Sequence, residues 1–292
     1  MLSIVRVLAP NPSVFTLEGT NTWVVGHDPS IVIDPGPDIA SHLDEVARAA
    51  GSVAAVLVTH DHEDHAPGGP AFAERVGAPL FAFRSDGADR LRDTQRFIGG
   101  EGVEVVAECT PGHSSDHVAF FVPSEGALFT GDAVVGRGTS FIDPPDGDLT
   151  QYMRSLRRMQ DLQARTIYPG HGPIVLDPRA KLDWYLAHRE ERERQVLEVI
   201  GDGKRTIADL VETIYADHPP EVHALAARSI LAHLLKLEGE GRAARAGKGD
   251  AALWTVIEPR ACERCGRTVK GRARLCGPCS LAMLQDKADA SG

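Results

Sequence analysis

A dense polar run, THDHEDH at residues 59–65, constrains this chain more than any other feature, because it directly follows the apolar segment 53–58. Four side chains in the run can bind a metal: His60, His62, Asp64 and His65. Residues two apart in an extended segment point the same way, so His60 and His62 can share one ion. The turn that follows can bring Asp64 and His65 toward a second ion. Imidazole and carboxylate ligands together favour zinc, with manganese or iron as substitutes.

Three more candidate ligands, His113, Asp132 and His171, each stand just beyond another short apolar run. A glycine precedes each of them, which lets the backbone approach a site closely. We expect these loops to meet the 59–65 run at one edge of a sheet. The sequence therefore predicts a single metal site assembled from four separate loops.

The chain has 292 residues, more than a usual single domain, so we expect one large domain with small appendages. Short apolar runs alternate with helical patterns over the first 200 residues, which predicts the α/β class with a partly mixed sheet. The expected strands lie at 22–25, 31–33, 53–58, 103–106, 118–122, 127–130 and 166–168. The expected helices lie at 39–50, 69–76, 149–162 and 178–200. Gly201-Asp202-Gly203 then breaks the last helix, so the large first domain is predicted to span 1–200.

The next segment, 201–258, has a different pattern. Helical periodicity at 206–215 and 221–237 is followed by two short runs at 242–245 and 252–257 that glycine-rich turns frame. Two helices followed by a β-hairpin are typical of a winged-helix domain.

The last segment, 259–292, is too short for a hydrophobic core and needs a metal or a partner to fold. It contains two CxxC pairs, formed by Cys262, Cys265, Cys276 and Cys279. This pattern predicts a four-cysteine structural zinc site; disulfides or free thiols are the alternative, which a reducing compartment disfavours.

The net charge of -10 argues against long-range attraction to nucleic acid, but basic residues gather between Arg260 and Arg274, against the single acid Glu263. That end of the chain is a possible contact for a polyanion. The sequence has no apolar run long enough to span a bilayer and no leader pattern at its start. We therefore expect a cytoplasmic protein with no membrane partner.

Taken together, these motifs resemble the metallo-β-lactamase superfamily. Its five motifs match Asp34 in the sequence IDPG, the run from His60 to His65, His113, Asp132 and His171. The resemblance covers residues 1 to about 200 and implies an αββα sandwich, with two β-sheets between layers of helices. It also implies that His60, His62 and His113 hold one zinc, that Asp64, His65 and His171 hold the other, and that Asp132 bridges them. Asp34 would support the ligands without binding metal.

Other segments resemble a narrower group, the β-lactamase-like protein 2 proteins. They are Glu18 to Thr22, His113 to His117, Gly136 to Thr139 and the long helix that contains His188 and Arg189. That group has a winged helix after the hydrolase domain and is associated with endoribonuclease activity on single-stranded RNA, which the resemblance extends to this chain as an implication. The cysteine-rich tail is not part of the group's usual pattern.

The expected mechanism follows from the metals. Two zinc ions about 3.5–4 Å apart would lower the pKa of a shared water from about 15.7 toward about 7, giving a bridging hydroxide as nucleophile. The residues assigned to catalysis are Asp64, Asp132 and His117. Asp132 would orient the nucleophile and could accept its proton. His117 could hold an anionic substrate or donate a proton to the leaving group.

Three functions are compatible with these residues. The first is hydrolysis of single-stranded RNA, with the winged helix and the basic tail contacting the strand. The second is hydrolysis of a thioester, lactone or other small acyl ester at the same metals. The third is nucleic-acid binding by a protein whose metal site is silent.

Overall fold

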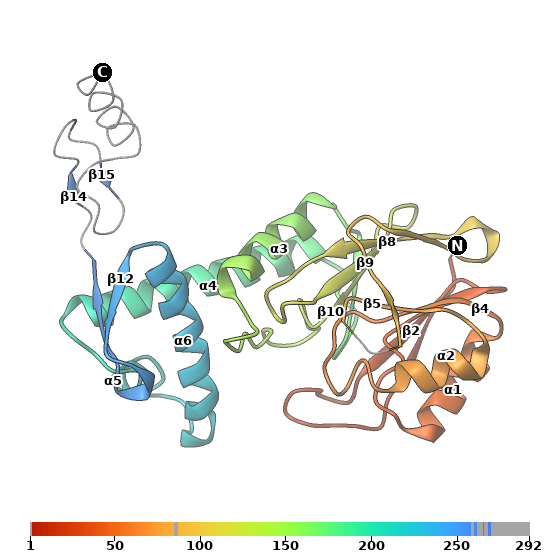
Figure 1. Cartoon of the computed structure of the whole chain (residues 1–292), viewed down its shortest axis with the longest axis horizontal. Helices are drawn as coiled ribbons and strands as arrows, with labels where there is room; N and C mark the ends of the chain where they lie inside the picture. Colours follow the sequence, from red (N-terminus) through yellow and green to blue (C-terminus); the bar gives the residue numbers. More distant parts are fainter. Residues whose placement is uncertain (1, 85–86, 258–259, 262–264, 266–267, 270–292) are drawn as a thin grey trace, which may run out of the picture. The chain divides into compact units, whose positions relative to one another are not determined.

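The computed structural model describes residues 2–84, 87–257, 260–261, 265 and 268–269 (Figure 1). Its contacts divide the chain into two compact units, one ending at His188 and one beginning at Arg189. We describe each unit by itself. In the part of the chain described, no helix is both long and apolar enough to cross a membrane.

The first unit contains a six-stranded sheet in sequence order. Its strands are β1 (Ile4–Leu8), β2 (Asn21–Val25), β3 (Ser30–Ile33), β4 (Val53–Leu57), β5 (Leu80–Ala82) and β6 (Asp89–Arg90). The strands β1, β2 and β3 pair antiparallel, and β3 to β6 pair parallel. The parallel strands β3 and β4 therefore end at the same edge, where Asp34 and the 59–65 run begin.

A five-stranded sheet completes the first unit, in the order β11-β10-β9-β8-β7. Its strands are β7 (Arg96–Ile98), β8 (Glu104–Cys109), β9 (Val118–Val122), β10 (Ala127–Gly131) and β11 (Thr166–Pro169). Only β10 and β11 pair parallel in this sheet. A short 3-10 helix, η1 (Gly100–Gly102), precedes β8.

The core lies between the two sheets because alternate residues of each strand face opposite sides. Trp23 and Val25 of β2 pack with Phe120 and Phe129 of the second sheet, in a cluster of buried side chains. The intervening Val24 belongs to a second cluster on the outer face of the first sheet.

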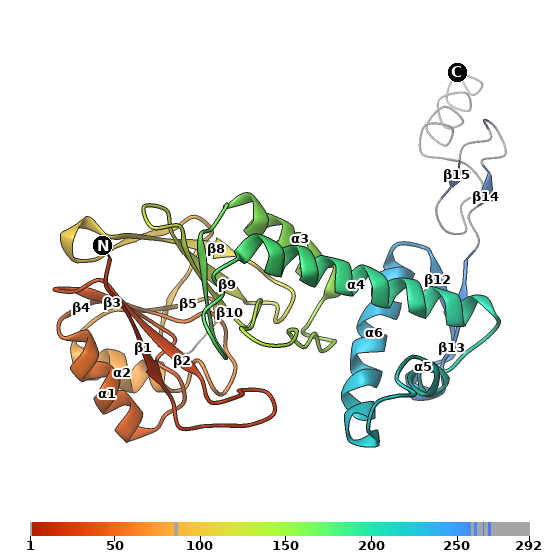
Figure 2. The same cartoon turned by 180° about the vertical axis from the view of Figure 1, so that it is seen from behind.

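Helices cover the outer faces. The helices α1 (Ala40–Ala50) and α2 (Gly68–Val76) contribute Val46 and Phe72 to the outer cluster of the first sheet. The helix α3 (Leu149–Asp161) begins at Asp148, whose carboxylate accepts a hydrogen bond from the Gln151 amide. Figures 1 and 2 show α1 and α2 on one outer side of the paired sheets and α3 on the other. The predicted arrangement of two sheets between helices is present.

The second unit includes the end of α4 (Pro178–Gly201), followed by helices and a β-hairpin. Its elements are α5 (Ile207–Ile214), η2 (Pro220–Val222), α6 (His223–Gly239), β12 (Ala243–Ala246), η3 (Gly249–Ala251) and β13 (Leu253–Val256). Val196 and Ile200 of α4 pack in its core beside Trp254. The helix that we placed in the first domain therefore also contributes to the second core.

In the first unit, four edge or short strands, β1, β5, β6 and β7, were not among the strands expected from the sequence. The predicted four-cysteine site lies outside the described residues, except for Cys265, which is exposed. Two short strands, β14 (Arg260–Ala261) and β15 (Thr268–Val269), pair antiparallel in the same segment.

A glycine beside His113 makes a testable contribution to this fold. Gly112 has a φ of 138°, and a β-carbon there would collide with the backbone of Tyr152 in α3. We expect Gly112→Ala to lower the free energy of unfolding of the first unit by about 1–3 kcal/mol or more, because overpacking and an unfavourable φ add. Thermal unfolding measures the change.

Gly239→Ala is the matched control, since nothing lies within 4 Å of a β-carbon at that helical position. It should leave the stability unchanged or raise it slightly. Equal effects of the two substitutions would contradict the close approach of α3 to the His113 loop.

Candidate metal centre

The seven predicted ligands come from loops at one end of the two sheets. The first four, His60, His62, Asp64 and His65, lie between β4 and α2. His113 lies between β8 and β9, Asp132 directly follows β10, and His171 follows β11. Side chains that are far apart in sequence therefore lie together at the ends of these strands.

The ligating atoms form two groups, and within each group they all lie within 4.8 Å of one another. The groups are His60, His62, His113 and Asp132, and Asp64, His65 and His171. This is the division that the family resemblance implies.

Asp132 lies between the two groups. Its Oδ2 is 3.8 Å from His113 Nε2, while its Oδ1 is 3.1 Å from His171 Nε2 and 3.4 Å from His65 Nε2. One carboxylate therefore faces the ligating atoms of both groups, as a residue that bridges two metal ions must. Its close approach depends on Gly170, where a β-carbon would lie 2.8 Å from Asp132 Oδ1.

Hydrogen bonds determine which ring nitrogen of each histidine is left to bind a metal. His113 Nδ1 lies 2.8 Å from the Phe141 carbonyl, and His171 Nδ1 lies 3.3 Å from the Gly19 carbonyl. A carbonyl can only accept, so both Nδ1 atoms carry the proton and both Nε2 atoms are left for the cluster. His62 is the exception, because its Nδ1 faces His60 Nε2 at 2.9 Å.

Asp34 orients the histidines of both groups. Its Oδ2 lies 2.8 Å from His65 Nδ1 and accepts a hydrogen bond from the Thr59 hydroxyl, also at 2.8 Å. Because that hydroxyl proton is used, the Thr59 oxygen accepts from His60 Nδ1, 3.0 Å away. This buried carboxylate therefore sets the ring orientation of His65 directly and that of His60 through Thr59.

Charge divides the two groups of histidines. Burial opposes protonation of His65, but Asp64, Asp34 and Asp132 outweigh it and raise the pKa of His65 well above its usual range. Burial likewise opposes the charged form of His171, yet Asp132 and Asp64 raise its pKa to about 9. In the absence of metal, protons on these rings neutralise the carboxylates.

In the other group, the pKa values of two histidines are lowered instead of raised. Burial, followed by repulsion from His65 and His113, lowers the pKa of His60 well below its usual range. Burial also lowers the pKa of His113. These rings are neutral, which is the form that binds a metal.

The donor arrangement fits metal ions. His60 Nε2 and His113 Nε2 both have a free lone pair and lie 2.9 and 3.2 Å from His62 Nδ1, which carries at most one proton and cannot donate fully to both. Among the described residues, Asp132 Oδ1 accepts no well-aligned hydrogen bond despite the nearby imidazoles. Acceptor atoms that converge with too few hydrogens to bridge them are stabilised by cations, and imidazole nitrogen with carboxylate oxygen is a ligand set of transition metals.

A cavity of about 600 Å³ opens beside the cluster. His62, Asp64, His113, Asp132 and His171 line its floor. The walls are mostly apolar and include Val14, Phe15, Leu17, Val135 and Phe141, with Arg137 at the edge. The rings of Phe15 and Phe141 lie 6.2 Å apart. Substrate can therefore reach the cluster along a partly aromatic wall.

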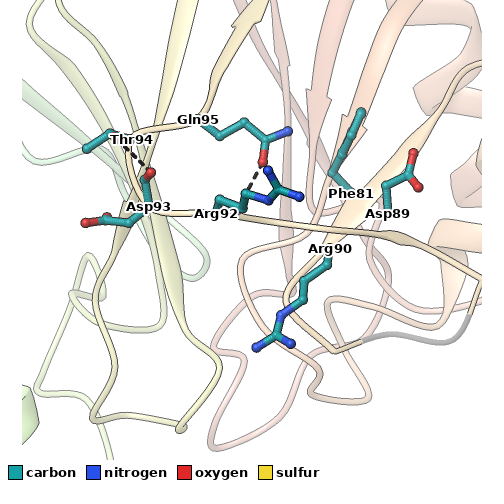
Figure 3. A pocket seen from close by; sticks show the side chains of 7 residues that line it. All are labelled: Phe81, Asp89, Arg90, Arg92, Asp93, Thr94 and Gln95. Carbon is teal, nitrogen blue, oxygen red and sulfur yellow. Dashed lines mark hydrogen bonds between the residues drawn. The ribbon is translucent and has the colours of Figure 1, made fainter.

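A second hollow, of about 520 Å³, lies elsewhere in the first unit (Figure 3). Phe81, Asp89, Arg90, Arg92, Asp93, Thr94 and Gln95 line it. None of these described residues is a predicted ligand, so this hollow is separate from the candidate metal centre.

His117 does not reach the cavity. It is 1% exposed, its ring lies 5.1 Å from that of His60, and its Nδ1 is 2.9 Å from the Thr110 hydroxyl. It is not among the described residues that line the cavity. The contact with substrate or leaving group that we predicted for His117 does not fit this buried position, which suits support of His60 instead.

The apolar residues of the cavity walls were not predicted from the sequence. Val14 and Phe15 are 83% and 56% exposed, which is unusual for large apolar side chains. Their position in a loop rich in Pro, Asn and Ser was the available signal. Phe141 is far away in sequence, so only the fold reveals that it faces Phe15.

Comparison with known proteins agrees with this geometry. Residues 15–171 match the metallo-beta-lactamase superfamily, and residues 206–254 match the beta-lactamase associated winged helix domain. The Beta-lactamase-like protein 2 homolog of Drosophila melanogaster is 35% identical over 284 residues, covering 88% of this chain and 94% of that protein. The Atrochrysone carboxyl ACP thioesterase of Aspergillus fumigatus is 36% identical over 241 residues, covering 75% of each chain.

Solved structures show the same fold. A metallo-beta-lactamase family protein from Thermus thermophilus superposes with a TM-score of 0.70 at 23% identity, covering 88% of this chain and 98% of that one. A beta-lactamase domain protein from Burkholderia ambifaria gives a TM-score of 0.73 at 20% identity, covering 88% and 91%. The chain therefore belongs to the metallo-β-lactamase superfamily of hydrolases, with a C-terminal β-lactamase-associated winged helix.

Proposed function

We propose that the first unit holds two zinc ions and hydrolyses phosphodiester bonds of single-stranded RNA. The observation that carries the metal assignment is the position of Asp132 between two groups of donors. His60, His62 and His113 would hold one ion, Asp64, His65 and His171 the other, and Asp132 both. Imidazole nitrogen with carboxylate oxygen suits zinc, with manganese or iron as substitutes.

Two zinc ions at this site would supply a water that ionises near neutral pH and an electrophile for the scissile group. The chain's own residues orient that chemistry. Asp34 and Thr59 keep His65 and His60 in fixed rotations, so the ligand set is preorganised. Asp132, whose carboxylate lies between the two groups of ligands, would orient the nucleophile there and could accept its proton.

The cavity supports an RNA substrate. Single-stranded RNA offers unstacked bases, which proteins bind on aromatic rings, and phosphates, which arginine binds. Phe15 and Phe141 provide aromatic rings beside the metal ligands, and Arg137, which forms an ion pair with Glu18, would provide the phosphate contact. The resemblance to the β-lactamase-like protein 2 group points to the same substrate, and the winged helix and the basic tail would contribute further contacts with the strand.

A thioester substrate is the second candidate. The relative from Aspergillus fumigatus is named as an ACP thioesterase and is similar over three quarters of this chain. The apolar walls formed by Val14, Leu17 and Val135 would also accept an acyl chain. Lactones and other small acyl esters belong to the same class, because the metals polarise a carbonyl as they polarise a phosphoryl group.

A substrate panel with one purified sample separates these functions. We expect zinc-loaded protein to cut a labelled single-stranded RNA and to leave an acyl-CoA thioester and a lactone largely intact. Asp132→Ala should lower the rate of RNA cleavage on the order of 10²–10⁴-fold or more, because it removes both a bridging ligand and a proton acceptor.

The matched control is Asp161→Asn, at the exposed end of α3, which should keep full activity. Intact RNA together with rapid thioester cleavage would overturn the RNA proposal in favour of the second candidate. RNA cleavage that survives in Asp132→Ala would instead indicate a contaminating nuclease.

We also propose a third, structural zinc at Cys262, Cys265, Cys276 and Cys279, from the spacing of the two CxxC pairs. Elemental analysis of the purified protein should then give about three zinc ions per chain. Cys276→Ser should remove one ion and leave kcat at the catalytic site unchanged, while KM for RNA rises because the tail contacts the strand.

Cys109→Ser is the control for this loss, since Cys109 lies in β8, away from the tail segment in sequence. It should retain every ion. A zinc content that Cys276→Ser does not change would exclude the four-cysteine site.

A further inference from the structure

The buried residue His42 lies on α1, outside every motif that the sequence singled out. Its side chain is 1% exposed, and its Nε2 is 2.9 Å from the Thr22 hydroxyl of β2. The same hydroxyl lies 2.6 Å from the main-chain carbonyl of Asp34. His42 is thus two hydrogen bonds away from the carboxylate-bearing residue that orients the metal ligands.

The direction of these hydrogen bonds follows from what each atom can do. A carbonyl only accepts, so the single hydroxyl proton of Thr22 goes to Asp34. The Thr22 oxygen must then accept from His42, which places a proton on His42 Nε2. Burial lowers the pKa of His42, so the ring is neutral and that proton is its only one.

Asp34 needs such support because of its backbone. Its φ is 51°, in the left-handed region that favours glycine. Glycine could adopt this conformation freely but would provide no carboxylate for His65 and Thr59. The turn also packs directly on the imidazole, since a β-carbon at Gly36 would lie 3.1 Å from His42 Nε2.

We propose that His42 is a positioning residue that acts through Thr22. It holds the main chain of Asp34 in the left-handed conformation from which the carboxylate reaches His65 Nδ1, the Thr59 amide and the Thr59 hydroxyl. The expected consequence of this positioning is a higher affinity of the cluster for metal, and that consequence rests on the proposed metal function. The geometry itself does not depend on a metal.

The first test measures amide exchange in the metal-free, full-length protein. The Thr59 amide donates to Asp34 Oδ1 at 2.7 Å, so its protection reports the position of that carboxylate. We expect His42→Leu, which removes the donor, to speed exchange at Thr59 by about tenfold. His42→Gln, which can present an amide proton at a similar reach, should restore most of the protection.

The second test is titration of the same variants with Co²⁺, followed by its visible absorption. His42→Leu and Thr22→Val should weaken binding by about tenfold, the lower end of the effect of residues that support metal ligands. His42→Gln should bind within about threefold of the wild type.

Ser30→Ala is the matched control. Ser30 in β3 has a buried hydroxyl that lies 3.0 and 3.2 Å from the carbonyls of Ala50 and Ser52 and donates its one proton between them, with no hydrogen bond to Asp34. It should cost stability without changing Thr59 exchange or Co²⁺ affinity.

Two results would overturn the proposal. One is an unchanged rate of Thr59 amide exchange in His42→Leu. The other is an equal rise in that rate, or an equal loss of Co²⁺ affinity, in His42→Leu and His42→Gln. If the exchange pattern holds but wild-type protein takes up no Co²⁺, the positioning role stands and the proposed metal function fails.

Discussion

The rest of the catalytic region depends on the contacts that the Asp132 carboxylate makes with the histidines around it. This carboxylate faces imidazoles from both groups of donors, and those imidazoles come from loops after β4, β8 and β11. Packing carboxylates and histidines so densely is unfavourable unless protons or cations balance them. The carboxylates raise the pKa of His65 and of His171, which favours protons in that role when no metal is present. Metal ions would replace those protons and draw the same loops together.

Most of this centre could be predicted from the sequence because its signals are local. Four ligating side chains within the run 60–65, and glycines before His113, Asp132 and His171, indicate strand-end loops at a metal site. The strand and helix pattern likewise predicted the mixed α/β class, because long segments have clear periods. The strands β5, β6 and β7 have only two or three residues, too few for a period to be detected.

What the sequence could not supply depends on contacts between distant segments. We expected His117 to contact the substrate or the leaving group, but its packing beside His60 buries it. Phe15 and Phe141 form one wall only after β2 and β10 have placed their loops together. The link from His42 to Asp34 is similar, since nothing in the helix pattern of α1 indicates which buried side chain faces the turn. The choice between RNA and an acyl substrate depends on these walls, because the metals would activate either bond.

Anomalous diffraction at the zinc edge from zinc-loaded crystals tests the central claim most directly. Two peaks about 3.5–4 Å apart, one beside His60, His62 and His113 and one beside Asp64, His65 and His171, are expected, with the Asp132 carboxylate between them. No peak, or a single peak that Asp132 does not contact, would contradict the account.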